Sequence, residues 1–181
     1  MHIVLTGEKG VGKTALVRDL VVELKAWGHR PFGFYTEKFS CGLRLQNVGG
    51  GPPLVLALTE PPKESAYCTL VGKYYFVNES VRLGLHMLRW PGDLLVVDEV
   101  GHWEALGGGF ARAIDFINSS EVRHSLIVVR RNILPSIIER YRREPMVIEV
   151  TGKNHKVLVD AIARRFHDLL VNEALEEHLT Q

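Results

Sequence analysis

A glycine-rich segment near the start of the chain, residues 7–14 (Gly-Glu-Lys-Gly-Val-Gly-Lys-Thr), matches the pattern of a phosphate-binding loop. Glycines let such a backbone curl until its N–H groups point inward and cradle phosphate oxygens. Lys13 is then expected to reach the β- and γ-phosphates of a nucleotide, and Thr14 to supply a hydroxyl to Mg²⁺. The predicted nucleotide-binding residues of this segment are Gly7, Glu8, Lys9, Gly10, Val11, Gly12, Lys13, Thr14 and Ala15.

Two acidic residues, Asp98 and Glu99, directly follow the apolar run 94–97 (Leu-Leu-Val-Val). An acid at the end of a buried strand holds the Mg²⁺ shell in many proteins that have a phosphate-binding loop. Asp98 is therefore predicted, with Thr14, to be a metal-site residue. Glu99 is predicted to be catalytic, because a carboxylate facing the γ-phosphate can orient a water molecule and accept its proton.

Two arginines, Arg130 and Arg131, end the apolar run 125–129. A guanidinium close to the γ-phosphate would stabilise the charge that spreads over the transferring phosphoryl oxygens. Strand alternation sends the two side chains in opposite directions, so at most one of them is expected to act. Arg130 is the catalytic candidate beside Lys13. The alternative, that both arginines are solvated strand-end charges, stays open.

The segment 151–154 (Thr-Gly-Lys-Asn) follows the last predicted strand and is the expected neighbour of the nucleotide base. Asn154 would contact the base through its amide, or Lys153 through its stem. The alternative for Asn154 is a structural one, in which it caps the helix that begins near Lys156. The pattern does not separate these two roles.

Apolar strand-like runs alternate with segments of helical periodicity along most of the chain, which predicts an α/β fold. We expect a mostly parallel sheet with helices on both faces, as in P-loop NTPases. Short segments separated by tight turns at about residues 39–77 predict an antiparallel hairpin insertion that edges this sheet. The candidate residues above follow strand ends, and the carboxyl ends of parallel strands are where such folds bind ligands.

Length and composition limit the classes of protein. With 181 residues, a single domain spanning 1–181 is expected. A net charge of +1 makes no case for a nucleic-acid binder, and two cysteines exclude a disulfide-rich scaffold. No run approaches the roughly 18 apolar residues that a membrane-spanning helix needs. We therefore expect a cytoplasmic protein with no membrane partner.

Several segments together resemble the small P-loop nucleoside-triphosphatases first described from thermophiles, whose animal relatives are called cancer-related nucleoside-triphosphatases. They are residues 7–14, 33–36 (Gly-Phe-Tyr-Thr), 71–74, 97–101 with Glu104, and 150–151 with Asn154.

The resemblance implies slow, Mg²⁺-dependent hydrolysis of several nucleoside triphosphates to diphosphates, on a RecA-like sheet with a hairpin insertion. It also implies that Gly10, Gly12, Lys13 and Thr14 bind phosphate and metal, and that Asp98 and Glu99 serve metal and water.

The predicted function is therefore a Mg²⁺-dependent nucleoside-triphosphate phosphohydrolase of broad base specificity, with ATP, GTP and other nucleoside triphosphates as ligands. A nucleotide or nucleoside kinase and a nucleotide-dependent switch remain the alternatives. The base-reading pattern Asn-Lys-x-Asp is absent from the sequence, which disfavours a Ras-like switch. Glu99 beside Asp98 favours hydrolysis over transfer to an acceptor. A protein partner is not specified by the sequence.

Overall fold

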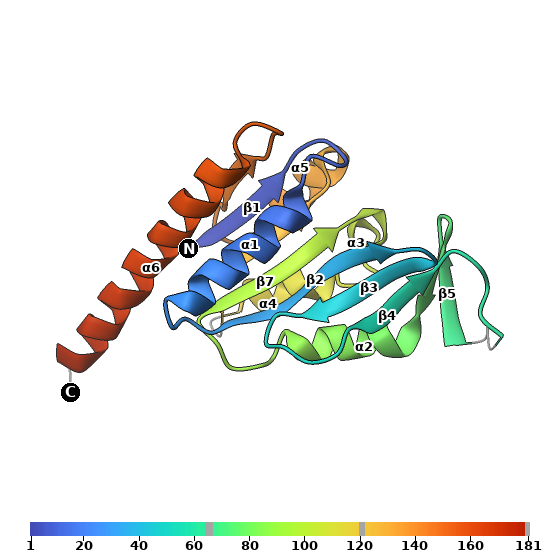
Figure 1. Cartoon of the computed structure of the whole chain (residues 1–181), viewed down its shortest axis with the longest axis horizontal. Coiled ribbons are helices and arrows are strands. Elements are labelled where there is room, and N and C mark those ends of the chain that lie inside the picture. Colours follow the sequence, from blue (N-terminus) through green and yellow to red (C-terminus); the bar gives the residue numbers. More distant parts are fainter. Residues whose placement is uncertain (64–66, 120–121, 180–181) are drawn as a thin grey trace.

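A computed structural model describes residues 1–63, 67–119 and 122–179, and within these it leaves out the side chains of Glu99 and His102. The described residues form a nine-stranded sheet in the order β5-β6-β4-β3-β2-β7-β8-β1-β9 (Figure 1). The strands are β1 (His2–Thr6), β2 (Pro31–Phe39), β3 (Gly42–Asn47), β4 (Leu54–Leu58), β5 (Cys68–Val71), β6 (Tyr74–Val77), β7 (Leu94–Val100), β8 (Ser125–Val129) and β9 (Met146–Glu149).

The parallel part of the sheet runs from β2 through β7, β8 and β1 to β9. Every residue of β8 is buried, and so is the segment 94–98 of β7. Such continuous apolar strands are typical of a parallel sheet that is covered on both faces. Because the five strands point the same way, the segments that follow β1, β7, β8 and β9 meet at one edge, here named the carboxyl edge.

The other part of the sheet is antiparallel, with β3 paired to β2, β4 to β3, β6 to β4 and β5 to β6. Among the described strands, four pairings are therefore parallel and four antiparallel. The sheet is therefore mixed, and the predicted excess of parallel over antiparallel pairings is wrong. β3 pairs with β4 and β5 pairs with β6, each its neighbour in sequence, and such pairs, joined by short connections, run in opposite directions. β4 pairs with β6 rather than with β5, and this pair is also antiparallel.

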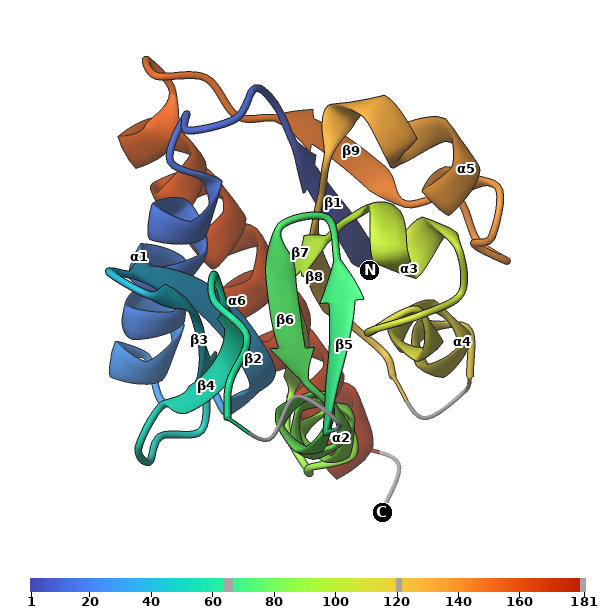
Figure 2. The same cartoon turned by 90° about the vertical axis from the view of Figure 1, so that its right-hand side faces the viewer.

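Helices cover both faces of the sheet (Figure 2), which confirms the predicted α/β class. One face carries α1 (Lys13–Ala26) and α6 (His155–Leu179), and Leu20 and Phe166 are among its fully buried residues. The other face packs against residues such as Phe34 and Ile114. Its helices are α2 (Asn78–Met87), α3 (His102–Ala105), α4 (Arg112–Ile117) and α5 (Leu134–Ile138), the last preceded by a 3-10 turn, Arg131–Ile133.

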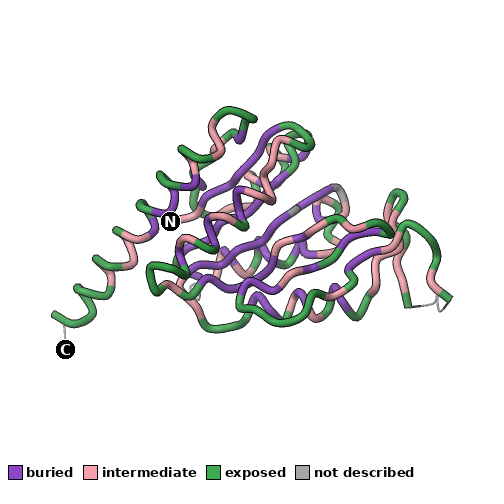
Figure 3. The backbone as a smooth tube through the Cα atoms, viewed as in Figure 1, coloured by how far each residue is buried: buried purple, intermediate pink, exposed green. Residues whose placement is uncertain are grey.

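Burial decreases along α6 toward its C-terminal end, which extends past the sheet as an exposed segment (Figure 3). Among the described residues, no helix combines the length and the apolar character that crossing a membrane requires.

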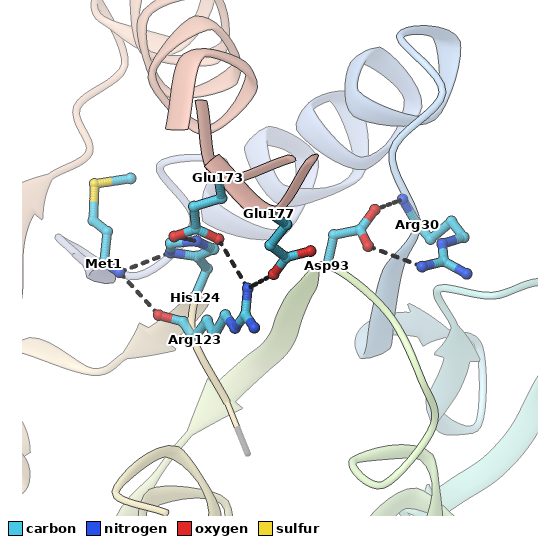
Figure 4. A network of polar contacts seen from close by, with 7 residues as sticks. All are labelled: Met1, Arg30, Asp93, Arg123, His124, Glu173 and Glu177. Atoms are coloured by element: carbon cyan, nitrogen blue, oxygen red, sulfur yellow. Dashed lines mark hydrogen bonds and ion pairs between the residues drawn. The ribbon is translucent and has the colours of Figure 1, made fainter. Parts of the chain in front are cut away.

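Opposite the carboxyl edge, the beginnings of the strands form what we name the amino edge, where α6 is held by charged side chains (Figure 4). His124, 4% exposed, lies with its Nε2 2.9 Å from Oε1 of Glu173 on α6. Arg123 donates to Glu177 at 2.6 Å, and the α-amino group of Met1 donates to the carbonyl of Arg123 at 2.9 Å. These contacts connect α6 to the start of β1 and to the segment before β8.

Candidate active site

The glycine-rich loop lies at the carboxyl edge, between β1 and α1, and its glycines adopt a backbone that other residues rarely take. Gly7 has φ 138°, and a Cβ atom there would lie 2.4 Å from the carbonyl oxygen of Val150. Gly12, the N-cap of α1, has φ 96°. These geometries require glycine. They lead the loop directly into α1, whose N-terminal N–H groups and positive dipole end suit an anion.

Lys13 is the first residue of α1, and its side chain turns back over the loop. Its Nζ donates hydrogen bonds to the carbonyls of Gly7 at 2.8 Å and Glu8 at 2.7 Å. The ammonium is thus held on the loop itself. Glu8, Lys9 and Gly10 are exposed, so this side of the loop is open to a ligand.

Asp98, only 1% exposed, connects three elements at the carboxyl edge. Its Oδ2 accepts hydrogen bonds from Thr14 Oγ1 at 2.7 Å and from the backbone N–H of Thr36 at 3.2 Å, and Thr36 Oγ1 lies 3.5 Å away. β2 carries Thr36 and pairs directly with β7, which carries Asp98. The fold therefore brings the end of β7 to the first turn of α1, 84 residues away in sequence.

Thr36 is a site residue to which the sequence assigned no role. It ends the Gly-Phe-Tyr-Thr segment that contributed to the family resemblance, and this was the only signal for it. Gly33 begins that segment with φ 102°, and a Cβ atom there would lie 2.1 Å from the carbonyl oxygen of Val96. The glycine thus lets β2 lie close against β7, which places Thr36 beside Asp98.

The Thr14 hydroxyl and the Asp98 carboxylate are suitable ligands for Mg²⁺. Both present hard oxygen atoms, and these atoms lie 2.7 Å apart, close enough for one ion to contact both. The described residues contain no group of three or more His, Cys, Asp or Glu side chains that could enclose a metal. Mg²⁺ commonly takes one or two protein oxygens and completes its shell with water and substrate phosphates, so this sparse pair fits that ion.

The two arginines after β8 diverge, and β8 itself lies between β1 and β7. A Cβ atom on Gly101 would lie 3.5 Å from Arg130 Nε, so the Arg130 guanidinium lies over the end of β7, three residues after Asp98. Arg131 instead donates to Glu8 of the loop at 2.8 Å and lies 3.3 Å from Glu149. The hydrogen bond that Arg131 donates to Glu8 raises the pKa of Arg131.

The predicted base, Glu99, is placed by its backbone in β7 next to Asp98, but its side chain lies outside the described residues. Glu104, 5% exposed, has a structural role instead. One oxygen accepts the N–H of Gly101 at 2.8 Å and the other accepts that of Phe110 at 3.2 Å. The first bond is one half of a capping box at the start of α3.

Asn154 lies in the loop between β9 and α6, with both ends of its amide bound to backbone groups. Its Oδ1 accepts the N–H of Thr151 at 2.8 Å, and its Nδ2 donates to the carbonyl of Glu149 at 2.9 Å. Asn154 also precedes α6, and its carbonyl accepts the N–H of Leu158. The side chain therefore shapes the loop rather than capping the helix through its amide.

Comparisons with known proteins match almost the whole chain. A family described as NTPase matches residues 2–163. Nucleoside-triphosphatase THEP1 of Caldivirga maquilingensis is 37% identical over 174 residues, which cover 93% of this chain and 96% of the relative. The human protein named cancer-related nucleoside-triphosphatase is 31% identical over 179 residues, covering 89% and 94%.

Two solved structures share the fold. The crystal structure of THEP1 from Aquifex aeolicus has a TM-score of 0.68 and 27% identity, and covers 90% of this chain and 96% of its own. The solution structure of a human cancer-related nucleoside triphosphatase has a TM-score of 0.70 and 27% identity, with 90% and 95% covered. The match from residue 2 to residue 163, together with relatives similar over nearly their full length, shows that the chain belongs to the NTPase family.

Proposed function

We propose that the protein hydrolyses nucleoside triphosphates to diphosphates and phosphate in a Mg²⁺-dependent reaction. The observation that carries this proposal is the contact at the carboxyl edge between Thr14, the second residue of α1, and the buried Asp98. It places two oxygen atoms suited to a metal ion, one from α1 and one from β7, directly beside the glycine-rich loop. The names of the similar proteins, nucleoside-triphosphatases, support the same reaction.

In the proposed reaction the loop residues 7–15 bind the phosphates through backbone N–H groups, and Lys13 stabilises the charge between the β- and γ-phosphates. Thr14 and Asp98 would hold the Mg²⁺ ion, which supplies charge neutralisation on the phosphate oxygens when it is bound. Asp98 is suited to this because Thr36 fixes its carboxylate through a backbone hydrogen bond. Its orientation therefore needs no rearrangement when the ion arrives.

Glu99 is proposed to orient the attacking water and accept its proton, since it follows Asp98 on the same strand. Arg130 is proposed to stabilise the charge of the transferring phosphoryl group, because its guanidinium lies over the end of β7. Arg131 is bound to Glu8 and lies close to Glu149, so it would instead offset the carboxylate of Glu8 next to the phosphates.

Broad base specificity follows from where these contacts fall. The cradle, Lys13, Thr14 and Asp98 all act on phosphate or metal and read no base. The oxygen and the nitrogen of the Asn154 side-chain amide are both bound to the backbone of its loop. Asn154 would therefore shape the surface beside the base rather than distinguish one base from another. We accordingly propose that ATP, GTP and other nucleoside triphosphates are substrates.

The same proposal extends to the architecture. We propose that residues 1–181 form a single P-loop domain of RecA-like type, in which about residues 39–77 are a hairpin insertion. The support is that the antiparallel strands β3 to β6 continue the sheet that carries the site. We propose a cytoplasmic location for the protein.

The decisive experiment incubates the protein with Mg²⁺ and a panel of nucleoside triphosphates, with and without nucleoside and nucleotide acceptors. Phosphate release without an acceptor is expected, with rates for ATP and GTP within about a hundredfold of each other, since phosphate contacts dominate. Label transfer to an acceptor would show a kinase instead. Binding of nucleotide without turnover would show a switch. The Glu99→Gln variant is expected to bind nucleotide without hydrolysing it, so it serves as the reference for that result in the same assay.

A further inference from the structure

A groove with a volume of about 430 Å³ lies between α2 and α4, away from the glycine-rich loop. Both helices pack on the face of the sheet that carries Phe34 and Ile114, whereas α1 covers the other face (Figure 2). The volume is in the range of small-molecule sites, which run from about 300 to 1,000 Å³. None of its lining residues belongs to the site described above.

The groove gathers positive charge on a chain whose charges otherwise balance, at 22 basic and 21 acidic residues. α2 contributes Arg82, the segment after α2 contributes Arg89, seven residues further on, and α4 contributes Arg112 from across the groove. Among the described residues, no carboxylate lies within ion-pair distance of Arg89 or Arg112. Asp115 is the acidic residue of the lining, and Arg140 already lies 3.6 Å from its carboxylate.

The same groove also has an apolar surface. Leu85 and Phe116 are partly buried hydrophobic side chains that pack against the core below, and both line the groove. The open part of the groove is thus an apolar floor with guanidinium groups around it. Guanidinium groups bind phosphate in paired hydrogen bonds, and an aromatic side chain such as Phe116 gives a flat surface for an apolar group.

We propose that this groove binds a small phosphorylated organic molecule, whose phosphate contacts Arg89 and Arg112 and whose apolar part lies on Leu85 and Phe116. This would be a second ligand site, independent of the proposed nucleotide hydrolysis. The guanidinium groups of Arg89 and Arg112 suit the double negative charge of a phosphate monoester better than a neutral apolar ligand, which would give them no opposite charge, whereas Arg82 is already paired with Glu79.

The test is a titration of the ¹⁵N-labelled full chain with phenyl phosphate, inorganic phosphate and phenol, observed by backbone amide shifts. Amides of α2 and α4 report the groove, and amides of residues 7–14 report the phosphate loop separately. Phenyl phosphate is expected to shift the groove amides saturably and to bind there at least about tenfold more tightly than either fragment, because both parts contribute. This result is independent of whether the protein hydrolyses nucleotides.

A double variant, Arg89→Glu with Arg112→Glu, should weaken phenyl phosphate binding in the groove at least about tenfold, because charge-assisted hydrogen bonds are lost. Arg165→Glu makes the same kind of charge change on α6, on the other face of the sheet. It should change the affinity of the groove for phenyl phosphate less than about twofold. All three positions are exposed, so the variants should fold.

Three results would overturn the proposal. The first is the absence of saturable shifts in the groove amides. The second is equal weakening by Arg165→Glu, which would mean general electrostatic attraction. The third is inorganic phosphate binding as tightly as phenyl phosphate, which would remove the role of the apolar floor.

Discussion

The two ends of the same parallel strands both collect polar side chains, but they do so in different ways. At the amino edge, charged groups form opposite pairs, such as Glu177 with Arg123 and Arg30 with Asp93 (Figure 4). At the carboxyl edge, Asp98 is surrounded by hydroxyl and backbone donors, and the Lys13 ammonium is bound by carbonyls. The ion pairs of the amino edge thus hold α6 to the beginnings of the strands, while the hydrogen bonds of Lys13 and Asp98 at the carboxyl edge join the glycine-rich loop, α1 and β2.

Backbone conformation separates the two edges further. The loop at the carboxyl edge uses left-handed glycines, of which Gly7 lies directly against the carbonyl of Val150, and such a backbone is retained where a ligand approaches it. The amino edge holds α6 to the strand beginnings through side chains. A polar cluster by itself therefore does not identify a site. The combination of left-handed glycines with the contacts of Lys13, Thr14 and Asp98 does, and we expect variants to divide into activity effects and stability effects accordingly.

The largest effect on activity is expected from Lys13→Ala. Loss of the cation bound to Gly7 and Glu8 removes the stabilisation of charge at the β- and γ-phosphates, so kcat should fall at least about a hundredfold. Lys9→Ala is the matched control, because the proposed phosphate contact of Lys9 is through its backbone N–H, which the substitution keeps, and the residue is exposed in the same loop. Steady-state phosphate release measures both. A near-normal rate for Lys13→Ala would refute the assignment of the carboxyl edge as the active site.

Arg130 and Arg131 provide the next comparison, within the carboxyl edge. Arg130→Ala is expected to reduce kcat at least about tenfold with nucleotide affinity little changed, because only the charge of the transition state would lose its partner. Arg131→Ala should leave kcat close to that of the unaltered chain, since its guanidinium binds Glu8. If both variants are silent in a turnover assay, the chain has no internal activating arginine.

The metal-ligand pair is tested with Thr14. Thr14→Val removes the hydroxyl that donates to Asp98 and should lower activity about tenfold or more, the value of a hydrogen bond to a charged group. Thr14→Ser restores the hydroxyl and should recover most of the rate. The dependence of the rate on Mg²⁺ concentration distinguishes the causes, because only a lost metal ligand would raise the Mg²⁺ requirement.

Stability, not activity, is the expected readout at the amino edge. Glu173→Gln weakens the contacts with His124 and Arg123, and should lower the free energy of unfolding by about 1 kcal/mol or less, as for partly exposed ion pairs. Urea unfolding measures this change. A loss of kcat without a loss of stability would contradict the division between the two edges.

At neutral pH the smallest effect is expected from His2 at the same edge, and it grows as the pH falls. Burial, with the nearby α-amino charge, lowers the pKa of His2 from 6.5 to about 4. The unfolded chain therefore binds the proton more readily, so the stability of the neutral histidine is complete above pH 6.5 and falls as the pH drops toward 4. His2→Asn should flatten the slope of stability in that window, measured by urea midpoints, whereas the matched change at the exposed His178 should not.

Local sequence patterns were sufficient for several elements. The strand at residues 125–129 has the bounds of the apolar run that predicted it, because every residue of a strand inside a parallel sheet is buried. The loop at residues 7–14 was also recognisable, since few sequences combine these glycines with Lys-Thr. β5 and the true proportion of parallel to antiparallel pairing could not be predicted, because pairing partners depend on contacts between distant segments.

The sequence by itself determined the chemistry that the chain carries: a glycine-rich loop with Lys13 and Thr14, and an acid after a buried strand. Tertiary structure decided which of these groups meet. Thr36 contacts Asp98 only because β2 and β7 pair in parallel, and Thr14 reaches the same carboxylate from 84 residues away. Spacing along a chain sets local geometry, whereas the distance between strand ends follows from sheet order, and that is a property of the whole fold.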